Sequence, residues 1–327
     1  MSEVNKYALV NINLDGEVMS KLIDVVSKGM GDLFEPWMIK RIAKATDFEM
    51  ETLKSSMKRN GLNGSLHISR NGLEINVKEG TVEERAIISL IQKEVNRQIN
   101  TEKIVASAIE NLKSIKSFSK EPVEDEWIQR FFNIAQEITD EDMQTIWSKI
   151  LSDEIVKPKS YSLRTLEVLR NMNKYEAELF SKYIKESLNT GEFRFRIDHN
   201  EMNKDRNITL EDRLLLQEIG LIQRELSKPI EPGTLTGYAI TNNLIMSIEN
   251  IDKNETYNLD IDITTRVGYE LSKLIDIDIN KERIKKIANA IREEGKGDLI
   301  VSMGVKPKWE SRRIVQWEKT NTNEYLE

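Results

Sequence analysis

The chain has 327 residues, 31% of them charged and 6% aromatic, and it carries a formal net charge of −7. This length allows about two domains with a sizeable core, and the scarcity of proline and glycine predicts a helix-rich soluble protein. The chain has no cysteine, which excludes disulfides, thiolate nucleophiles and cysteine-ligated zinc or iron–sulfur centres. The negative charge opposes non-specific nucleic-acid binding by the whole surface, although a local basic patch could still bind.

The residues of the common catalytic centres are missing from the sequence. It contains no P-loop, no G-x-G-x-x-G, no G-x-S-x-G and no H-E-x-x-H motif, and its only histidines are His67 and His199. The acids between residues 140 and 154 have no histidine or cysteine beside them, and consecutive acids on a helix point in different directions. We therefore predict no catalytic residue, no cofactor and no metal site, with a carboxylate-only nuclease as the alternative.

The sequence also bears on localisation. Residues 1–10 lack a basic region followed by an apolar run, so we expect no signal peptide. No stretch of about 18 apolar residues occurs, and a membrane-spanning helix is not expected. We predict a cytoplasmic protein, with a peripheral membrane contact of its N-terminal part as an alternative.

Residues 1–115 are predicted to form an N-terminal helical region. A first helix covers about residues 16–34, and its apolar side chains recur at the spacing of one helix face. Such a stripe is typical of a bundle helix, of a contact between copies, or of a helix lying in a membrane surface. Its nearly neutral polar face favours the first two interpretations. A second helix begins directly after Pro36. The candidate interaction surface consists of Val18, Leu22, Val26, Met30, Trp37 and Arg41.

The same region contains a predicted β-hairpin and a long helix. Apolar and polar residues alternate from about 65 to 77, and Asn71-Gly72 is the preferred dipeptide of a two-residue hairpin turn. Thr81 and Glu84 then form a capping-box pattern in front of a helix that covers about 82–115. A helix of this length could serve as a spine between copies, so we predict a homo-oligomer.

Residues 123–190 are predicted to form a central helical core. Its first helix begins at the acidic residues 124–126, a second is expected to start at the N-cap Thr139, and Pro158 ends it. A third helix begins near Ser162, and short connections force the three together. The residues that we expect to define this core are Trp127, Phe131, Trp147, Glu154 and Arg164.

The most specific part of this core is a run of aromatic, polar and turn-forming residues. The run comprises Trp127, Phe131-Phe132, Gln144, Trp147, Ile150-Leu151, Glu154, Pro158 and the sequence Ser162 to Leu166. It resembles the bacterial family catalogued as domain of unknown function 2806, and it is also similar to the alpha-type abortive-infection proteins of bacteria. Lys159 departs from the pattern, in which glycine is expected. The first family has no assigned catalytic residue, whereas the second resemblance implies a role in phage defence.

Residues 191–327 are predicted to form a winged-helix-like C-terminal domain. Its expected elements are a helix at about 209–219, a tight turn, strands at about 238–248 and 257–263, and a helix at about 264–275. A winged helix binds DNA through a basic helix in the major groove. The candidate helix offers only Arg213 against Glu211, Asp212 and Glu218. We therefore interpret the region as a packing or protein-contact module, with DNA binding as the alternative.

The last segment, residues 306–319, combines cations with aromatic rings. This combination is typical of a contact with single-stranded nucleic acid or phosphate. It is equally typical of a closing strand whose tryptophans fill the core, and we favour the closing strand. The candidate phosphate contacts are Lys306, Lys308, Arg312 and Arg313.

Together these patterns predict a mostly helical α+β protein. It should contain N-terminal amphipathic helices with a hairpin, a central helical bundle and the winged-helix-like module. We expect a non-enzymatic interaction protein of bacterial phage defence, which acts through self-association or by binding a host or phage protein. The alternatives are a DNA-binding regulator of the winged-helix type and a peripheral membrane effector, neither of which is favoured.

Overall fold

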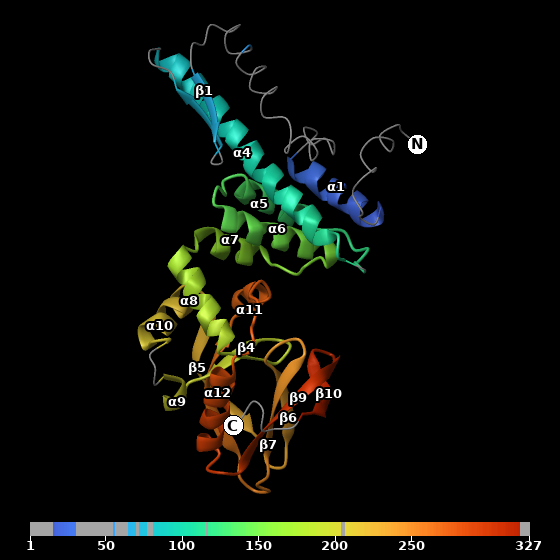
Figure 1. The fold of residues 1–327 in the computed structure, drawn as a ribbon, viewed down its shortest axis with the longest axis vertical. Coiled ribbons are helices and arrows are strands. Elements are labelled where there is room, and N and C mark those ends of the chain that lie inside the picture. Colours follow the sequence, from blue (N-terminus) through green and yellow to red (C-terminus); the bar gives the residue numbers. More distant parts are fainter. Residues whose placement is uncertain are drawn as a thin grey trace. The chain divides into compact units, whose positions relative to one another are not determined.

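A computed structural model describes residues 16–30, 55, 65–69, 72–76, 81–115, 117–203 and 207–320 (Figure 1). The predictions for residues 1–15, Pro36, Trp37 and Arg41 lie outside the described residues. Helices occur together with an eight-stranded antiparallel sheet, which confirms the α+β class. None of the described helices is long and apolar enough to cross a membrane.

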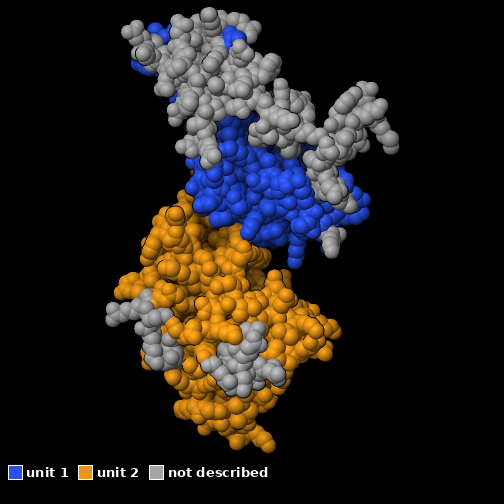
Figure 2. Space-filling view, viewed as in Figure 1, with its two compact units in different colours: residues 1–166 blue, residues 167–327 orange. Residues whose placement is uncertain are grey.

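The chain divides into two compact units, residues 1–166 and 167–327 (Figure 2). The division falls inside helix α7 (Leu163–Asn171), within the region predicted as the central core. The predicted boundaries lie at residues 115–123 and 190–191. Each unit buries its own set of apolar side chains.

The described part of unit 1 combines helices with a hairpin. Its elements are α1 (Gly16–Met30), β1 (Ser65–Ser69), β2 (Gly72–Asn76), α4 (Val82–Leu112), α5 (Asp125–Ala135), α6 (Glu141–Val156) and the first residues of α7. The predicted capping box starts α4. The Thr81 hydroxyl accepts from the Glu84 amide at 3.2 Å, and Glu84 Oε2 accepts from the Thr81 amide at 2.8 Å. These bonds satisfy amides that the first helical turn leaves unpaired.

The predicted hairpin is confirmed, but its turn is shifted. β1 and β2 pair antiparallel, with Leu66 opposite Ile75 and Ser69 opposite Gly72. Gly72 is therefore the first residue of a strand and not part of the turn, as Asn71-Gly72 had suggested. β2 packs against α4.

Helix α1 packs against α5 through its apolar face. Val18, Leu22 and Val26 are buried there, as expected for apolar residues that repeat every three or four positions. A Cβ atom at Gly29 would lie 1.9 Å from Phe132 Cδ2. Because only a residue without a side chain permits this approach, Gly29 sets the distance between α1 and α5.

Aromatic rings fill the space between α5 and α6. Trp127 and Phe131 stack with 5.0 Å between ring centroids, and Phe131 meets Trp147 at 5.3 Å. All three are at most 4% exposed, and these distances are favourable for aromatic pairs. The start of α6 corrects a prediction: Asp140, not Thr139, is its N-cap, because the Asp140 carboxylate accepts from the amide three residues on at 2.9 Å.

Unit 2 is organised around the eight-stranded sheet, whose order is β10-β9-β7-β6-β3-β4-β8-β5. Its strands are β3 (Leu188–Asn189), β4 (Arg194–Ile197), β5 (Ile222–Ile230), β6 (Leu235–Ala239), β7 (Leu244–Asn250), β8 (Tyr257–Thr264), β9 (Leu299–Glu310) and β10 (Arg313–Lys319). Its helices, besides the end of α7, are α8 (Lys174–Lys185), α9 (Asn200–Asn203), α10 (Leu210–Glu218), α11 (Arg266–Ser272) and α12 (Lys281–Glu294). α12 packs against β8 and β9, and its apolar residues join the core of the sheet.

The winged-helix-like layout is not confirmed. Residues 238–248, expected as one strand, contain a turn that separates β6 from β7. There the Leu244 amide donates to Thr241 Oγ1 at 3.1 Å, and the Ile240 amide donates to the Leu244 carbonyl at 2.9 Å. β7 and β8, the strands expected to form the wing, are not neighbours, because β6, β3 and β4 lie between them.

Strand β5 forms one edge of the sheet and interrupts its own regularity. Glu225 has a left-handed backbone, with φ 62°, in a register shift of the β5–β8 pairing. Pro229 has no amide hydrogen to donate. The Lys228 ammonium group lies 5.7 Å from the ring centroid of Phe195 and 5.3 Å from that of Tyr238, both core residues. An edge strand with such features pairs poorly with a further strand.

Candidate functional site

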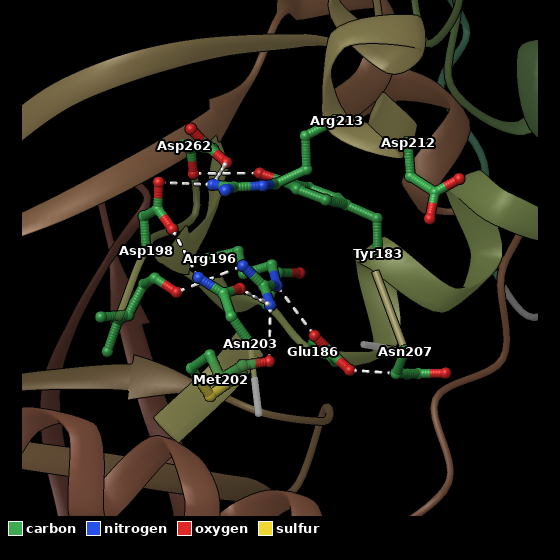
Figure 3. A network of polar contacts seen from close by, with 12 residues as sticks. Tyr183, Glu186, Arg196, Asp198, Met202, Asn203, Asn207, Asp212, Arg213 and Asp262 are labelled. Atoms are coloured by element: carbon green, nitrogen blue, oxygen red, sulfur yellow. Dashed lines mark hydrogen bonds and ion pairs between the residues drawn. The ribbon is translucent and has the colours of Figure 1, made fainter. Parts of the chain in front are cut away.

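A network of buried charges in unit 2 connects the sheet with helices α8 and α10 (Figure 3). Arg196 on β4 is fully buried. Its Nε donates to Glu186 Oε2 at 2.8 Å, and its Nη2 donates to the Met202 carbonyl at 2.9 Å and to Asn203 Oδ1 at 3.0 Å. These oxygen atoms replace the water that the charge would otherwise need.

Arg213 on α10 forms the second centre of the network (Figure 3). Its Nη1 lies 2.9 Å from Asp262 Oδ2 and 2.5 Å from Asp198 Oδ2. Asn203 joins the two centres, because its Nδ2 donates to Asp198 Oδ1 at 2.9 Å while its Oδ1 accepts from Arg196 Nη2. Arg224 on β5 approaches the other carboxylate oxygen of Asp262, with 3.6 Å between Nε and Oδ1.

The alternation of side chains between the two faces of β4 explains where its arginines lie. Its sequence Arg194-Phe195-Arg196-Ile197 is buried at all four positions, and successive side chains of a strand point to opposite faces. Phe195 and Ile197 belong to the hydrophobic core, so Arg194 and Arg196 share the other face. Arg196 is also the direct partner of Asp262 in the β4–β8 register. β4 thus carries the core on one face and the charges on the other.

The network fastens two helices to the sheet. Glu186, the C-cap of α8, binds Arg196, and the Tyr183 hydroxyl of the same helix donates to the Asp262 carbonyl at 3.0 Å. α10 is held through Arg213. Removing one partner of a buried ion pair typically costs about 3–5 kcal/mol, because it leaves an uncompensated charge. The positions of α8 and α10 are therefore strongly coupled to the sheet.

Burial and pairing act against each other on the charges of the network. Burial disfavours the charged form of Arg213, but hydrogen bonds with Asp198 and Asp262 outweigh it and raise the pKa of the guanidinium. Burial would raise the pKa of Asp198, but Arg213 and Asn203 lower it. Burial raises the pKa of Tyr183. All three pKa values move away from neutrality, where a general acid or base would need to be, so the arrangement suits positioning better than proton transfer.

Arg194, beside the network, is bound by neutral groups. Its Nε donates to Ser187 Oγ at 2.7 Å, and its Nη2 donates to the Ser187 carbonyl at 2.9 Å. No carboxylate among the described residues forms an ion pair with it. Burial lowers the pKa of Arg194 to about 10, which still leaves the side chain protonated at neutral pH.

Helices α8 and α10 each carry exposed apolar side chains. Tyr175 on α8 is 58% exposed, and Leu210 and Leu214 on α10 are each 49% exposed. The Tyr175 hydroxyl donates to Asp212 Oδ1 at 2.8 Å, which holds the ring beside α10. We call Tyr175, Leu210 and Leu214 the helix-pair surface. Leu210 and Leu214 lie one turn apart on α10, and neighbouring exposed apolar side chains, unlike scattered ones, mark a candidate contact site.

Three of the six residues of the predicted N-terminal interaction surface are buried in the structure. Val18, Leu22 and Val26 are buried within unit 1, because α1 packs on α5 and α6. For these three residues the prediction was wrong, and the stripe is the core-facing side of a bundle helix. The remaining predicted residues are Met30, which is partly buried, and Trp37 and Arg41, which lie outside the described residues.

The predicted phosphate-contact residues lie in the hairpin of β9 and β10. Lys306 Nζ is 2.9 Å from Glu318 Oε2, and Lys308 Nζ is 2.9 Å from Glu310 Oε1. Both lysines therefore already face an acid. The exposed cations at the turn of the hairpin are Arg312 and Arg313.

The two tryptophans of this hairpin differ in burial. Trp317 packs over glycines of the sheet, since a Cβ at Gly304 would lie 2.4 Å from its ring and one at Gly237 would lie 3.1 Å from it. Trp309 is 37% exposed. β10 is thus the expected closing strand. Trp309 also lies over a glycine, since a Cβ at Gly191 would lie 2.8 Å from its ring.

The predicted central motif consists of three core aromatic residues, one buried acid and one exposed arginine. Its three aromatic residues form the core described above. Glu154 is 2% exposed, its Oε2 accepts from the Tyr161 amide at 3.1 Å, and its Oε1 accepts from the Lys159 amide. Lys159 has φ 68°, a left-handed conformation that explains why glycine is expected there. Arg164 is exposed on α7.

Sequence reasoning missed the charge network, although a signal was present. Arginine and aspartate are rarely buried, so their alternation with apolar residues suggests a strand with one face in water. The available clue was that two alternating strands carry opposite charges. Arg194 and Arg196 alternate with apolar residues on one strand, and Asp260 and Asp262 do so on another. In the structure Asp262 is buried and Asp260 is exposed.

The comparisons with known proteins concern the family of this chain. Among the residues that the structure describes, no group of three His, Asp or Glu side chains could hold a metal ion. Residues 84–288, more than half of the chain, match the model of the family described as "Protein of unknown function (DUF2806)". No curated protein and no solved structure matches the chain. The match confirms the resemblance carried by the run from Trp127 to Leu166, and the chain therefore belongs to the domain of unknown function 2806 family.

Proposed function

We propose that this chain is a protein-binding component of bacterial phage defence, and that it binds its partner through the helix-pair surface. The observation that carries the binding role is the exposure of Tyr175, Leu210 and Leu214 on helices that the buried network holds in place. A surface that is fixed before binding loses less conformational entropy when a partner docks. The defence role is supported by the similarity of the central run to abortive-infection proteins.

The charges around this surface indicate the chemistry of the partner. Glu211 and Glu218, both exposed, accompany the leucines on α10, whereas the arginine of this helix, Arg213, points inward to Asp262. The exposed side of α10 is therefore apolar and acidic. It fits a protein that presents apolar side chains flanked by lysine or arginine, since opposite charges at the rim steer and orient association.

The two rival functions receive less support. A DNA-binding regulator would need cations on its recognition helix, but Arg213 is buried and paired. In the basic hairpin, Lys306 and Lys308 face acids, which leaves Arg312 and Arg313 for a phosphate contact. A peripheral membrane effector would need the apolar stripe of α1, which packs against α5.

Phage plating on a host with and without this gene tests the proposal. We expect protection against some phages of an unrelated panel, and its loss in the Leu214→Asp variant. The matched control is Leu235→Asp on β6, where the leucine is 46% exposed and belongs to neither α8 nor α10. Equal protection by both variants would contradict the assigned surface, and protection by none of the proteins, wild type included, would contradict the defence role.

A further inference from the structure

The first half of α4 carries apolar side chains that the described structure leaves exposed. Val82 is 69% exposed, Ile87 49% and Leu90 65%, and Ala86 between them is exposed as well. Ile88, on another side of the helix, is buried. Residues 82, 86 and 90 follow the four-residue spacing of one helix face. This face lies in unit 1 and is independent of the helix-pair surface.

The face has the spacing of a seam between two helices. Glu83, Ala86, Leu90 and Lys93 recur at intervals of three and four residues, as core positions do where two helices wind around each other. Ala86 is small and Leu90 is large, so a leucine of one helix could fill the space over an alanine of another. All four residues are exposed.

The charges at the two ends of the seam favour a second copy of α4 and determine the direction in which it binds. Glu83 lies at one end and Lys93 at the other, and Lys93 forms no ion pair with another described residue. Two copies of α4 in parallel would place glutamate against glutamate and lysine against lysine, which is unfavourable. In the antiparallel arrangement Glu83 of each copy lies opposite Lys93 of the other, and Leu90 lies opposite Ala86.

We propose that a second copy of this chain docks on this face, with the two α4 helices antiparallel. The seam has few apolar layers and is shorter than the contact of a stable dimer, which buries at least about 1,000 Å². The contact is therefore weak when it acts alone, and the dimer fraction rises with protein concentration.

Sedimentation of the full chain over a range of concentrations tests the contact. We expect a monomer–dimer equilibrium that is lost in the Leu90→Asp variant and kept in Leu235→Asp, which introduces the same charge at an exposed leucine of unit 2. Glu83→Lys should weaken the dimer, and Glu83→Lys combined with Lys93→Glu should restore it. A wild-type chain that stays monomeric, or a dimer that persists in Leu90→Asp, would overturn the proposal.

Cross-linking determines the direction of the helices, since the natural chain has no cysteine. Glu83→Cys and Lys93→Cys chains of different mass are mixed and treated with a short bis-maleimide. We expect linkage between the two kinds of chain and none within either kind. Linkage of Glu83→Cys chains to each other would indicate a parallel pair and overturn the antiparallel arrangement. Failure here would leave the phage-plating result on the helix-pair surface unaffected.

Discussion

Lys159 has a backbone conformation that is unfavourable for a residue with a side chain. Its φ of 68° lies in the left-handed region, which costs a residue with a side chain roughly 1–2 kcal/mol. Its Nζ lies 2.6 Å from Glu121 Oε1, but both side chains of this pair are about half exposed, and such pairs contribute about 0–1 kcal/mol. The backbone cost is therefore larger than the gain from the ion pair.

We predict that Lys159→Gly is more stable than Lys159→Ala by about 1 kcal/mol, because both variants lose the ion pair and only glycine relieves the backbone. The free energy of unfolding, measured by urea denaturation, provides the comparison. Equal stabilities of the two variants would show that the left-handed conformation costs nothing at this position.

At the scale of elements, the approach of α1 to α5 depends on Gly29. In an exposed helix alanine is favoured over glycine by roughly 1 kcal/mol. At Gly29 the added methyl group would overlap the Phe132 ring, and overpacking of this kind typically costs about 1–3 kcal/mol. We predict that Gly29→Ala lowers the free energy of unfolding by about 1–2 kcal/mol, measured by chemical denaturation.

The matched control for this prediction is Gly16→Ala in the same helix. A Cβ at Gly16 would meet nothing within 4 Å, so this change should be neutral or slightly stabilising. If Gly29→Ala were as harmless as Gly16→Ala, the close contact between α1 and α5 would not exist in solution.

The elements could be predicted where the signal is local, and not where it depends on distant partners. The capping box of Thr81 and Glu84 and the alternation around residues 65–76 act over a few residues, and both predictions are confirmed. The sheet order pairs β3 and β4 with residues about 50–70 positions further along the chain, and local patterns carry no information on such pairings. The helix α10 was predicted, but not its orientation, because nothing in its own sequence shows that Arg213 faces Asp262.

At the scale of the whole molecule, the network makes the stability of unit 2 depend on pH. The folded pKa of Asp198 is lowered by Arg213 and Asn203 against the effect of burial. A carboxylate with a lowered folded pKa stabilises the fold above its unfolded pKa of about 3.9, and this contribution disappears as the pH falls through the folded pKa. The stabilisation is thus present at neutral pH and lost in acid.

We predict that Asp198→Asn lowers the free energy of unfolding by about 1–3 kcal/mol at pH 7. The difference from the wild type should shrink as the pH falls below about 4, because Asp198 of the unfolded chain becomes protonated first and the folded carboxylate follows at its lower pKa. Urea denaturation at several pH values checks this. Asp260→Asn, at an exposed acid on β8, is the control and should change little. A difference that stays constant down to pH 3 would contradict the ionic origin of the effect.

The edge strand β5 limits how unit 2 can recruit a partner. A sheet edge with free amide and carbonyl groups can accept a strand from another chain, which is a common route to both recognition and aggregation. Three features of β5 interrupt the row of free amide and carbonyl groups. They are the register shift at Glu225, the missing amide hydrogen of Pro229 and the Lys228 side chain, which points toward the core. These features therefore oppose the addition of a strand from another chain along this edge. They also oppose pairing between the sheet edges of two copies when the protein is concentrated.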